Sequence, residues 1–272
     1  MPHPYTSPPP ENFPHYRRPS AKDAPSFTSH LARTDAAQAF SQGAETYQDV
    51  RPGYPDEVAA LLAGFPSVVD IGAGTGKFTE ALGNHTVYAL DPSADMCRVL
   101  RNKGGALVWR AKAEATALPA ASVHAASCAQ TWHWVDSPAA CAELDRIIRP
   151  GGRVVLVWNT LDVTAHPWVL RLSRIMHSGD VQKEGFYPEV GAPWEITQEL
   201  RLKWEDTTTP ERLHQLMHTR SYWLRAKEKT QLRMTHNLNW YLFEHLGFAQ
   251  GQHITLPYRT DAFVLERAPK SP

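Results

Sequence analysis

Cysteine is scarce in this sequence: three occur among 272 residues, and they lie far apart. The number is odd and no pair has the CxxC spacing, so Cys97, Cys128 and Cys141 argue against a disulfide framework and against a zinc site. Unpaired cysteines fit a reducing compartment. The sequence therefore predicts a cytoplasmic protein without a bound metal.

Long apolar runs and an excess of either charge are also missing. No run approaches the roughly 18 apolar residues of a membrane span, and the first residues lack the apolar core of a signal peptide. The 28 basic and 28 acidic residues balance to a net charge of zero, so no global field attracts nucleic acid or an anionic membrane. Neither is expected as a partner, and the sequence leaves the oligomeric state open.

Proline, in contrast, is dense at the start of the chain, which reads MPHPYTSPPPENFPHYRRPS. This composition predicts a disordered or polyproline arm over residues 1–34. Regular patterns begin at Asp35. We expect a ligand-binding domain over residues 35–159, a helical cap over 160–248 and C-terminal strands over 249–268.

Short apolar segments alternate with helix-compatible segments in the ligand-binding region. The expected strands span residues 67–72, 86–91, 106–112, 124–131 and 152–159, and the expected helices span 77–82, 94–102 and 138–148. Such alternation predicts βαβ units and a doubly wound α/β fold, with a mostly parallel sheet covered by helices on both faces. Ligands in such sheets bind at the carboxyl ends of the strands.

The rhythm changes after Asn159. Residues 163–248 lean towards helix, and HITLPYRTDAFVLER near the C-terminus has the pattern of strand, turn and strand. We therefore expect a seven-stranded sheet with helical cap segments inserted after the fifth strand and a C-terminal hairpin that completes it.

The glycine-rich stretch GAGTGK follows the first expected strand. A triphosphatase loop, GxxxxGK[ST], requires a hydroxyl where this chain has Phe78 and a glycine where it has Ile71. A dinucleotide loop, GxGxxG, requires a third glycine where this chain has Lys77. Asp91 at the end of the second strand suits a ribose, but several nucleoside-binding folds share that feature.

The string DIGAGTGKF resembles the first motif of class I S-adenosylmethionine-dependent methyltransferases, in which an acidic residue precedes GxGxG. Four later segments resemble the following motifs in the correct order: LDPS (90–93), AKAEATALP (111–119), SCAQTWHWVD (127–136) and LDRIIRPGGRVVLVWN (144–159). The RPGYP entry segment and the HW pair are similar to small-molecule methyltransferases of the trans-aconitate type. The resemblance implies S-adenosylmethionine as cofactor and a small-molecule methyl acceptor.

The same resemblance implies roles for individual residues. Asp91 would bind both ribose hydroxyls, and the pair Ala113 and Glu114 would lie against adenine. The implied cofactor-binding residues are Tyr47, Arg51, Asp70, Gly72, Ala73, Gly74, Thr75, Gly76, Asp91, Pro92, Met96, Ala113, Glu114, Ala129 and Gln130. His124 stands where the family usually has aspartate, at a position that is more often structural than catalytic.

His133 falls at the carboxyl end of the fourth expected strand, where the methyl acceptor should approach. Its ordinary pKa suits proton removal near neutral pH, and the alternative is a histidine that shapes the pocket by bonding to the backbone. Asp136 with Pro138 reads as a helix N-cap. The candidate substrate-binding residues are Trp132, Trp134, Arg171, Arg220, Tyr222 and Trp223. His214 and His218 stand four residues apart but lack the glutamate of HExxH.

The function expected from these features is methyl transfer to a small molecule, with O-methylation of a carboxylic acid first because arginine clamps carboxylates. O- or N-methylation of an aromatic metabolite is the alternative, since Trp168, Trp194, Tyr222 and Trp223 could stack on a ring. A non-catalytic protein that binds the cofactor or a partner on the same fold is a third possibility.

Overall fold

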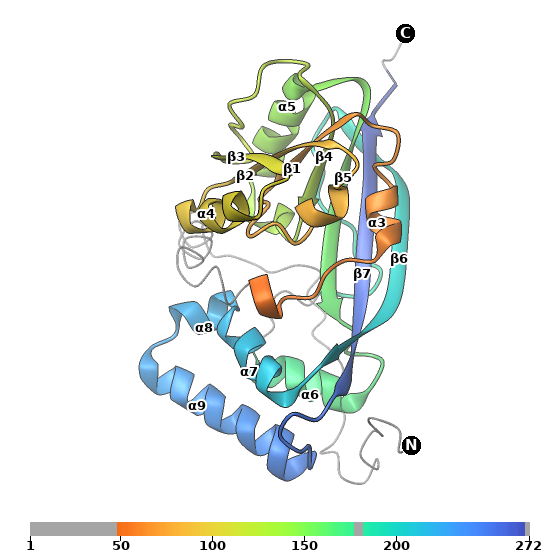
Figure 1. Ribbon diagram of the computed structural model, residues 1–272. Helices are drawn as coiled ribbons and strands as arrows, with labels where there is room; N and C mark the ends of the chain where they lie inside the picture. The colour runs from red at the N-terminus through yellow and green to blue at the C-terminus, as the bar shows by residue number, and fades with distance from the viewer. Residues whose placement is uncertain (1–47, 177–181, 270–272) are drawn as a thin grey trace. The chain divides into compact units, whose positions relative to one another are not determined.

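A computed structural model describes residues 48–176 and 182–269, and Tyr47 and the proline-rich arm lie outside them (Figure 1). The described chain divides into two compact units. We call residues 48–159, 187–202 and 260–269 the sheet unit, and residues 160–176, 182–186 and 203–259 the helical unit. Residues 187–202 thus belong with the sheet unit and not with the expected cap.

Seven strands form one sheet in the order β3-β2-β1-β4-β5-β7-β6. The strands are β1 (Ser67–Ile71), β2 (Thr86–Asp91), β3 (Ala106–Arg110), β4 (Val123–Ala129), β5 (Ile148–Leu161), β6 (Trp194–Thr208) and β7 (Ile254–Arg267). The first five pair in parallel, with Asp70 of β1 opposite Ala89 of β2 and Ser127 of β4. The predicted doubly wound, mostly parallel seven-stranded fold is confirmed.

The helical segments are α3 (Asp56–Ala60), η3 (Thr79–Leu82), α4 (Ala94–Lys103), η4 (Trp132–Trp134), α5 (Ser137–Ile147), α6 (Pro167–Ile175), α7 (Pro210–His218), α8 (Ser221–Arg225), α9 (Glu228–Asn239) and η5 (Trp240–His245). In the sheet unit, α4 and α5 follow the expected helices 94–102 and 138–148 closely. The predicted cap of α5 is confirmed, because Asp136 accepts a 3.1 Å hydrogen bond from the Ala139 amide. The segment after the glycine loop is a short 3-10 helix, η3, in place of the longer helix expected.

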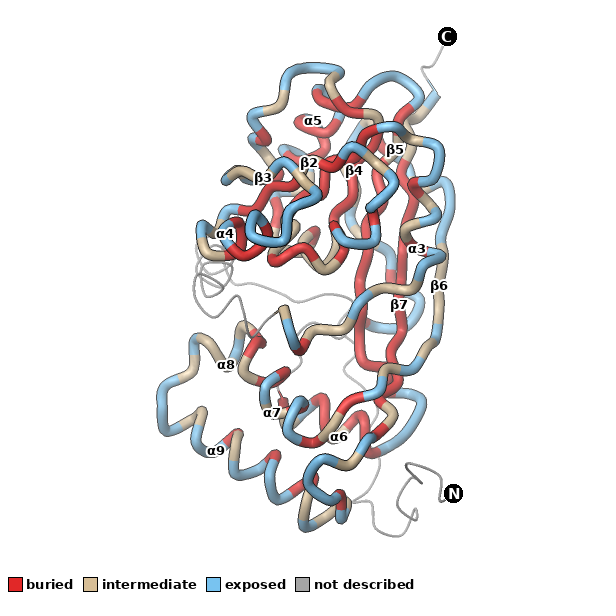
Figure 2. The backbone as a smooth tube through the Cα atoms, viewed as in Figure 1, coloured by how far each residue is buried: buried red, intermediate tan, exposed pale blue. Residues whose placement is uncertain are grey.

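Each unit has its own apolar core. In the sheet unit, Val58 and Leu62 from the α3 segment pack on β-strand residues such as Val68 and Val155. In the helical unit, Trp168 and Tyr241 are fully buried, and the Tyr241 hydroxyl donates a 3.0 Å hydrogen bond to the Trp168 carbonyl. Figure 2 shows the buried strands and the buried inner sides of the helices in red. Burial of apolar side chains is the main stabilising term in both units.

Two elements differ from the sequence prediction. Strand β6 lies inside the region expected to be helical, although Leu200, Leu202 and Trp204 alternate with charged residues as a strand requires. Strand β7 is continuous where a hairpin was expected, because Pro257 needs no partner for its nitrogen and its carbonyl accepts a 2.9 Å bond from the Asp162 amide. Strand β7 runs antiparallel in the otherwise parallel sheet.

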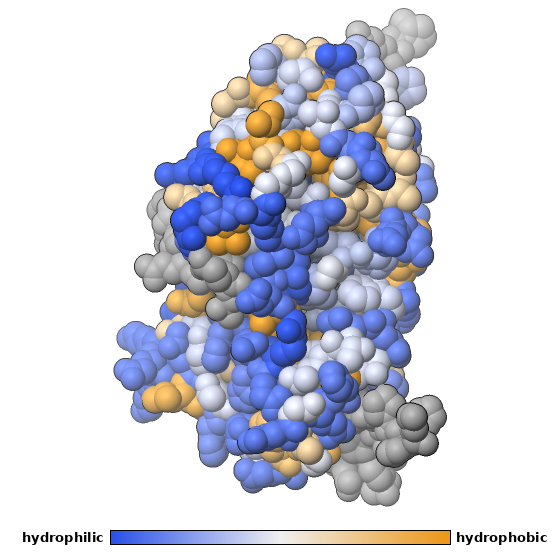
Figure 3. All heavy atoms as spheres, in the orientation of Figure 1, coloured by the Kyte–Doolittle hydropathy of each residue, from blue (hydrophilic) through white to orange (hydrophobic). Residues whose placement is uncertain are grey.

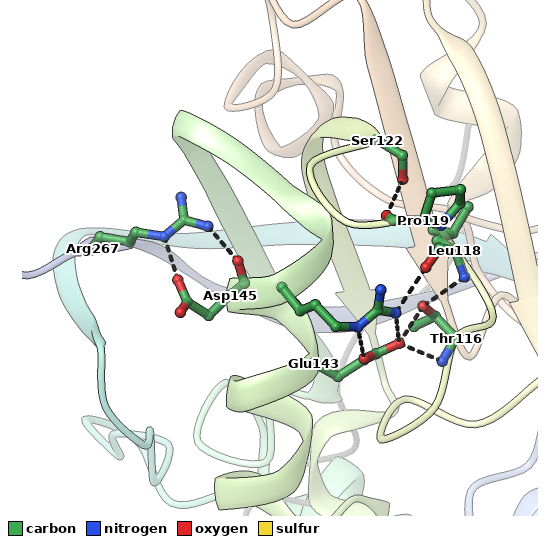
Figure 4. A network of polar contacts seen from close by, with 8 residues as sticks. Thr116, Leu118, Pro119, Ser122, Glu143, Asp145 and Arg267 are labelled. Atoms are coloured by element: carbon green, nitrogen blue, oxygen red, sulfur yellow. Dashed lines mark hydrogen bonds and ion pairs between the residues drawn. The ribbon is translucent and has the colours of Figure 1, made fainter.

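A polar network ties the connection between β3 and β4 to α5 (Figure 4). Glu143 Oε1 accepts bonds of 2.7 Å from the Thr116 amide and 2.5 Å from the Thr116 hydroxyl, and Arg146 binds the same carboxylate at 2.7 Å. The Arg146 hydrogen bond is the main reason that the pKa of Glu143 falls to about 2. The network fixes the chain that leads out of β3 past Ala113 and Glu114.

Hydrophilic residues cover most of the surface visible in Figure 3, with hydrophobic residues in smaller groups between them. Within residues 48–176 and 182–269, none of the helices has the length and apolar character needed to span a bilayer.

Candidate functional site

Asp70 is an internal anchor of the site. The carboxylate is 1% exposed and accepts bonds of 2.6 Å from the Thr79 hydroxyl and 2.8 Å from the Ser127 hydroxyl. These bonds join the end of β1 to η3 and to β4. Burial raises the pKa of Asp70 to about 6, against the lowering effect of both hydroxyls. Asp70 therefore fixes the end of β1, where the glycine loop begins, to η3 and to β4.

The glycine loop turns through three left-handed residues, with φ of +66° at Gly72, +57° at Gly74 and +92° at Gly76. A Cβ on Gly72 would lie 2.3 Å from Cγ2 of Thr131, and one on Gly76 would lie 2.3 Å from Cδ1 of Leu100. Glycine is required there because L-residues avoid this backbone region and because neighbouring side chains fill the space. A Cβ on Gly74 meets no atom within 4 Å, so this glycine faces an open side.

Two further loop residues bond within the sheet unit. The Ala73 amide donates a 3.0 Å bond to the Leu90 carbonyl, which fastens the loop to β2. The hydroxyl of Thr75 donates a 2.6 Å bond to Oε1 of Gln48, three residues before the RPGYP segment. Arg51 is half-buried in the turn that leads to α3. The loop is thus held between β2 and Gln48.

Asp91 ends β2 and points its carboxylate at the same loop. Oδ2 accepts a 3.0 Å bond from the Gly74 amide, and Oδ1 accepts a 2.8 Å bond from the Ser93 amide. The residue is 9% exposed, and burial raises its pKa to about 6 although both amides lower it. Each oxygen keeps a second lone pair, so the carboxylate can still accept two ribose hydroxyls.

The residues implied for the adenine side surround the ends of β2 and β3. Met96 and Ala113 are buried, and Pro92 is exposed. Oε1 of Glu114 accepts a 2.8 Å bond from the amide of Asp136, the residue that caps α5. Glu114 thus has a structural partner in addition to its implied role beside adenine.

The turn after β4 lies directly against the glycine loop. The Thr131 hydroxyl donates bonds of 3.1 Å to the Gly72 carbonyl and 3.0 Å to the Ala129 carbonyl. Trp132 is buried, and its indole donates a 2.8 Å bond to the Glu189 carbonyl. Trp132 therefore supports this turn from inside the sheet unit.

His133 follows in the short helix η4. Its Nδ1 is bonded to Nε1 of Trp158 at 3.3 Å, and its ring lies tilted against Trp134 with centroids 4.8 Å apart. Trp158 is a buried residue of β5 that also contacts the ring of Phe263 edge-on. His124, at the other end of β4, has a structural arrangement, with Nδ1 2.8 Å from the Ser67 hydroxyl.

The remaining substrate-binding candidates belong to the helical unit. The Arg171 guanidinium lies over the rings of Trp240 and Tyr241, at 5.7 and 5.4 Å. Arg220 is buried, whereas Tyr222 is exposed at the surface. Trp223 stacks on His218 with centroids 4.2 Å apart. Burial lowers the pKa of both His214 and His218, so the two rings favour the neutral form.

These residues fit S-adenosylmethionine. The open side of Gly74 leaves room for a ligand, the Asp91 carboxylate suits the ribose, and Oε1 of Gln130 is a buried oxygen without a partner among the described residues. The sequence did not reveal Thr79 and Ser127 as partners of Asp70, nor Trp158 as the partner of His133. The DPS string did contain a signal for Ser93, whose hydroxyl accepts from the Met96 amide as an N-cap.

Known proteins were compared with this chain. A methyltransferase domain profile matches residues 69–156. An uncharacterised methyltransferase of Mycobacterium tuberculosis is 35% identical over 236 residues, which cover 84% of this chain and 96% of the relative. A malonyl-[acyl-carrier protein] O-methyltransferase of Hahella chejuensis is 31% identical over 154 residues, covering 50% of this chain and 54% of the relative.

A solved structure described as a type II methyltransferase from Anaeromyxobacter dehalogenans has a TM-score of 0.61 at 24% identity, covering 80% of this chain and 97% of the other. That likeness shows the shared fold. The long sequence match, the family profile over the glycine loop and the strand ends, and the fold agree. The chain belongs to the class I S-adenosylmethionine-dependent methyltransferases, with S-adenosylmethionine as its cofactor.

Proposed function

We propose that this enzyme methylates a carboxylate oxygen of a small organic acid. The observation that carries the proposal is the 3.3 Å hydrogen bond between Trp158 Nε1 and His133 Nδ1. An indole nitrogen only donates, so His133 Nδ1 is the acceptor and the proton of the neutral ring lies on Nε2. Nε2 of His133 is then a hydrogen-bond donor and not a base.

This tautomer favours an acceptor that needs no proton removed. A hydroxyl or amine would have to lose a proton, whereas a carboxylate is already ionised at neutral pH. S-adenosylmethionine supplies an electrophilic methyl group on a sulfonium. One carboxylate oxygen forms the new O–C bond as the C–S bond breaks, leaving a methyl ester and S-adenosylhomocysteine. His133 Nε2–H donates to the second carboxylate oxygen, and catalysis is mainly in-line positioning.

Two further points support an acid. The relative from Hahella chejuensis is named for O-methylation of a malonyl group, which ends in a carboxyl. The RPGYP segment and the HW pair resemble small-molecule methyltransferases of the trans-aconitate type, whose acceptor is also an acid.

The aromatic alternative has less support in the structure. Trp168 and Trp194 are 0% and 3% exposed and belong to the interiors of their own units, so neither can stack on a ligand ring. Trp223 is already stacked on His218. Of the four aromatic residues that suggested this acceptor, Tyr222 has the most exposed side chain.

A product test separates the acceptor classes. Purified enzyme is given S-adenosylmethionine with an isotopically labelled methyl group and a fraction of small acidic metabolites, and labelled products are identified by mass spectrometry. We expect a methyl ester that mild base hydrolyses to release labelled methanol. A base-stable methyl ether or methylamine as the main product would contradict the proposal.

A matched pair of variants tests the role of His133. In His133→Gln the side-chain amide places an N–H donor near the position of the imidazole Nε2, whereas His133→Ala removes it. We expect the Gln variant to keep kcat within about tenfold of wild type and the Ala variant to lose about 10²-fold, the lower range for a positioned polar group. Equal losses of kcat in both variants, with affinity for S-adenosylhomocysteine unchanged, would identify His133 as a base.

A further inference from the structure

Helix α9 has a buried side and an exposed side. Met234 and Leu238 are buried in the core of the helical unit, together with Tyr241 of η5. The exposed residues on the opposite side are spaced three or four positions apart, as one face of a helix requires. We call them the outer face of α9, and they are Lys229, Leu232, Arg233, His236 and Trp240, the first residue of η5. Figure 2 shows exposed and buried residues alternating along this helix.

Two large apolar side chains of the outer face are exposed to water. Leu232 is 64% exposed and Trp240 is 37% exposed. The described residues include five exposed large hydrophobic side chains, and Tyr222 joins these two to place three of the five between residues 222 and 240. Exposed apolar groups bordered by polar residues are a feature of interaction surfaces.

The basic side chains of the outer face have no carboxylate bound to them. Within residues 48–176 and 182–269, neither Lys229 nor Arg233 forms an ion pair, although Glu228 begins the same helix and Glu244 lies in η5. The guanidinium of Arg171, from α6, adds a third positive charge 5.7 Å from the centre of the Trp240 ring.

Exposed basic residues on a helix of the sheet unit are arranged differently. On α4, Arg98 pairs with Asp95 at 2.7 Å, and Lys103 pairs with Glu80 at 2.5 Å. These positive charges are balanced within the chain, whereas those of Lys229 and Arg233 are not. The outer face of α9 therefore combines unbalanced positive charge with exposed apolar side chains.

This combination limits the kind of partner. A helix that lies on a membrane turns its apolar side to the lipid, but the apolar side of α9 is buried in the helical unit. A second copy of the chain, related by twofold symmetry, would bring the positive charges of the face against themselves. Nucleic-acid phosphates complement Lys229 and Arg233 but offer nothing apolar to Leu232, which lies between them. A peptide segment can supply both carboxylates and apolar side chains.

We propose that the outer face of α9 binds an acidic segment of a protein partner. Carboxylates of that segment pair with Lys229 and Arg233, and one of its apolar side chains packs on Leu232. The charges speed the encounter and select an acidic partner, while burial of Leu232 adds affinity. This binding is independent of the methyl acceptor and of the cofactor.

Fluorescence anisotropy on the full chain tests the surface with defined probes. The first probe is a labelled synthetic peptide of about 16 residues, roughly four helical turns, with Glu and Leu on one side. The second has Gln in place of every Glu. We expect wild type to bind the Glu peptide at least about tenfold more tightly than the Gln peptide at low salt, and the difference to shrink as salt is added.

A matched pair of double variants locates the contact. Lys229→Gln with Arg233→Gln removes two unbalanced charges from α9, and Arg98→Gln with Lys103→Gln removes two balanced charges from α4. We expect the α9 variant to bind the Glu peptide about 5- to 10-fold more weakly than wild type, the range for two exposed charge pairs, and the α4 variant to change less than about twofold. Leu232→Ser should weaken binding about fivefold while the salt dependence persists.

The other outcomes contradict the proposal. An equal loss in the α4 variant would show that only the total charge of the protein matters. Equal binding of the Glu and Gln peptides, or no binding of the Glu peptide at about 1 mM, would reject an acidic partner. Anionic lipid vesicles and a single-stranded RNA are further probes, and a larger loss with either of them in the α9 variant would assign the face to that class instead. If the melting curve shows that the α9 variant does not fold, Leu232→Ser decides, and unchanged peptide affinity in it would reject the surface.

Discussion

The backbone amide of Gly74 donates a 3.0 Å hydrogen bond to Oδ2 of Asp91, across 17 positions of sequence. This bond joins the glycine loop to the carboxylate at the end of β2. The carboxylate holds the loop in the conformation that leaves its open side for the cofactor, and we expect it to be the acceptor for the ribose. Loss of its charge is therefore expected to weaken both roles at once.

The pH dependence of cofactor binding follows from that carboxylate. Because burial raises the pKa of Asp91 to about 6, the ionised acceptor is present above pH 6 and is lost as pH falls below it. We expect the affinity for S-adenosylhomocysteine to fall by up to about tenfold per pH unit between pH 6 and pH 5. Calorimetry at each pH measures it. Asp91→Asn should bind weakly at pH 7.5 and show no slope, and a wild-type affinity that is flat down to pH 5 would contradict the role of Asp91.

Asp70 should make the unfolding free energy of the ligand-free protein fall as pH rises, whereas cofactor affinity rises with pH. Its pKa is raised to about 6 from 3.8, so the folded state binds more protons than the unfolded state between these values. The unfolding free energy should decrease as pH rises through 6, by on the order of 2–3 kcal/mol for this group. Chemical denaturation of wild type and Asp70→Asn between pH 4.5 and 7.5 measures it. The Asn variant should lose much of the slope, and an unchanged slope would point to another group.

Changing Gly72 or Gly74 of the loop to alanine should lower the unfolding free energy by different amounts. Gly72→Ala combines left-handed strain with a contact of 2.3 Å to Thr131, and we expect it to lower the unfolding free energy by about 2–4 kcal/mol. Gly74→Ala has strain without a contact, so about 1–2 kcal/mol is expected, together with loss of cofactor affinity because its Cβ enters the open side. Denaturation and calorimetry of both variants separate the two effects. Equal destabilisation would contradict the close approach of Thr131.

The carboxylate of Glu143 should contribute more to the unfolding free energy than that of Asp145, although both lie on α5 and contact arginine (Figure 4). Glu143→Gln replaces a charged acceptor for Thr116 and Arg146, and we expect a loss of about 1–3 kcal/mol at pH 7. Asp145→Asn alters an exposed ion pair with Arg267 and should cost under about 1 kcal/mol. Because the pKa of Glu143 is lowered to about 2, its contribution should be present above pH 4.5 and fade as pH falls towards 2. A wild-type acid transition that Glu143→Gln leaves unchanged would exclude this group as its cause.

The tautomer of His133 can be observed directly. Nitrogen NMR of ring-labelled protein at pH 8 should show the proton on Nε2, because Nδ1 accepts from Trp158. Trp158→Phe removes the donor and keeps an aromatic ring beside Phe263, so the two tautomers should become mixed. A proton on Nδ1 in wild type would reverse the assignment and remove the main support for a carboxylate acceptor.

Local signals predicted the strands and turns around the glycine loop well. The strand ends, the glycine loop and the position of Asp91 at the end of β2 each follow from residues close together in sequence, because a βα turn is built from one short segment. The N-cap at Asp136 was predictable for the same reason.

Contacts between distant segments were not predictable in this way. Ser127 reaches Asp70 across 57 positions and Trp158 reaches His133 across 25, and both pairs depend on which strands become neighbours. The continuity of β7 was missed because Pro257 normally signals a break. Pro257 fits within β7 because only its carbonyl forms a hydrogen bond with the chain that follows β5, and a single sequence does not reveal this. The cofactor-binding roles of individual residues and the substrate candidates of the helical unit stay predictions.

The strand order also determines when β6 can form its hydrogen bonds during protein synthesis. Among the described strands, β6 is at the edge of the sheet beside β7, which leaves the ribosome after the other six strands of this sheet. During translation, the fifteen residues of β6 are exposed as an unpaired strand until Arg267 has emerged. Unpaired strands promote association between chains. The charged residues that alternate along β6, such as Glu199, Arg201 and Lys203, thus protect a nascent chain that cannot yet close its own sheet.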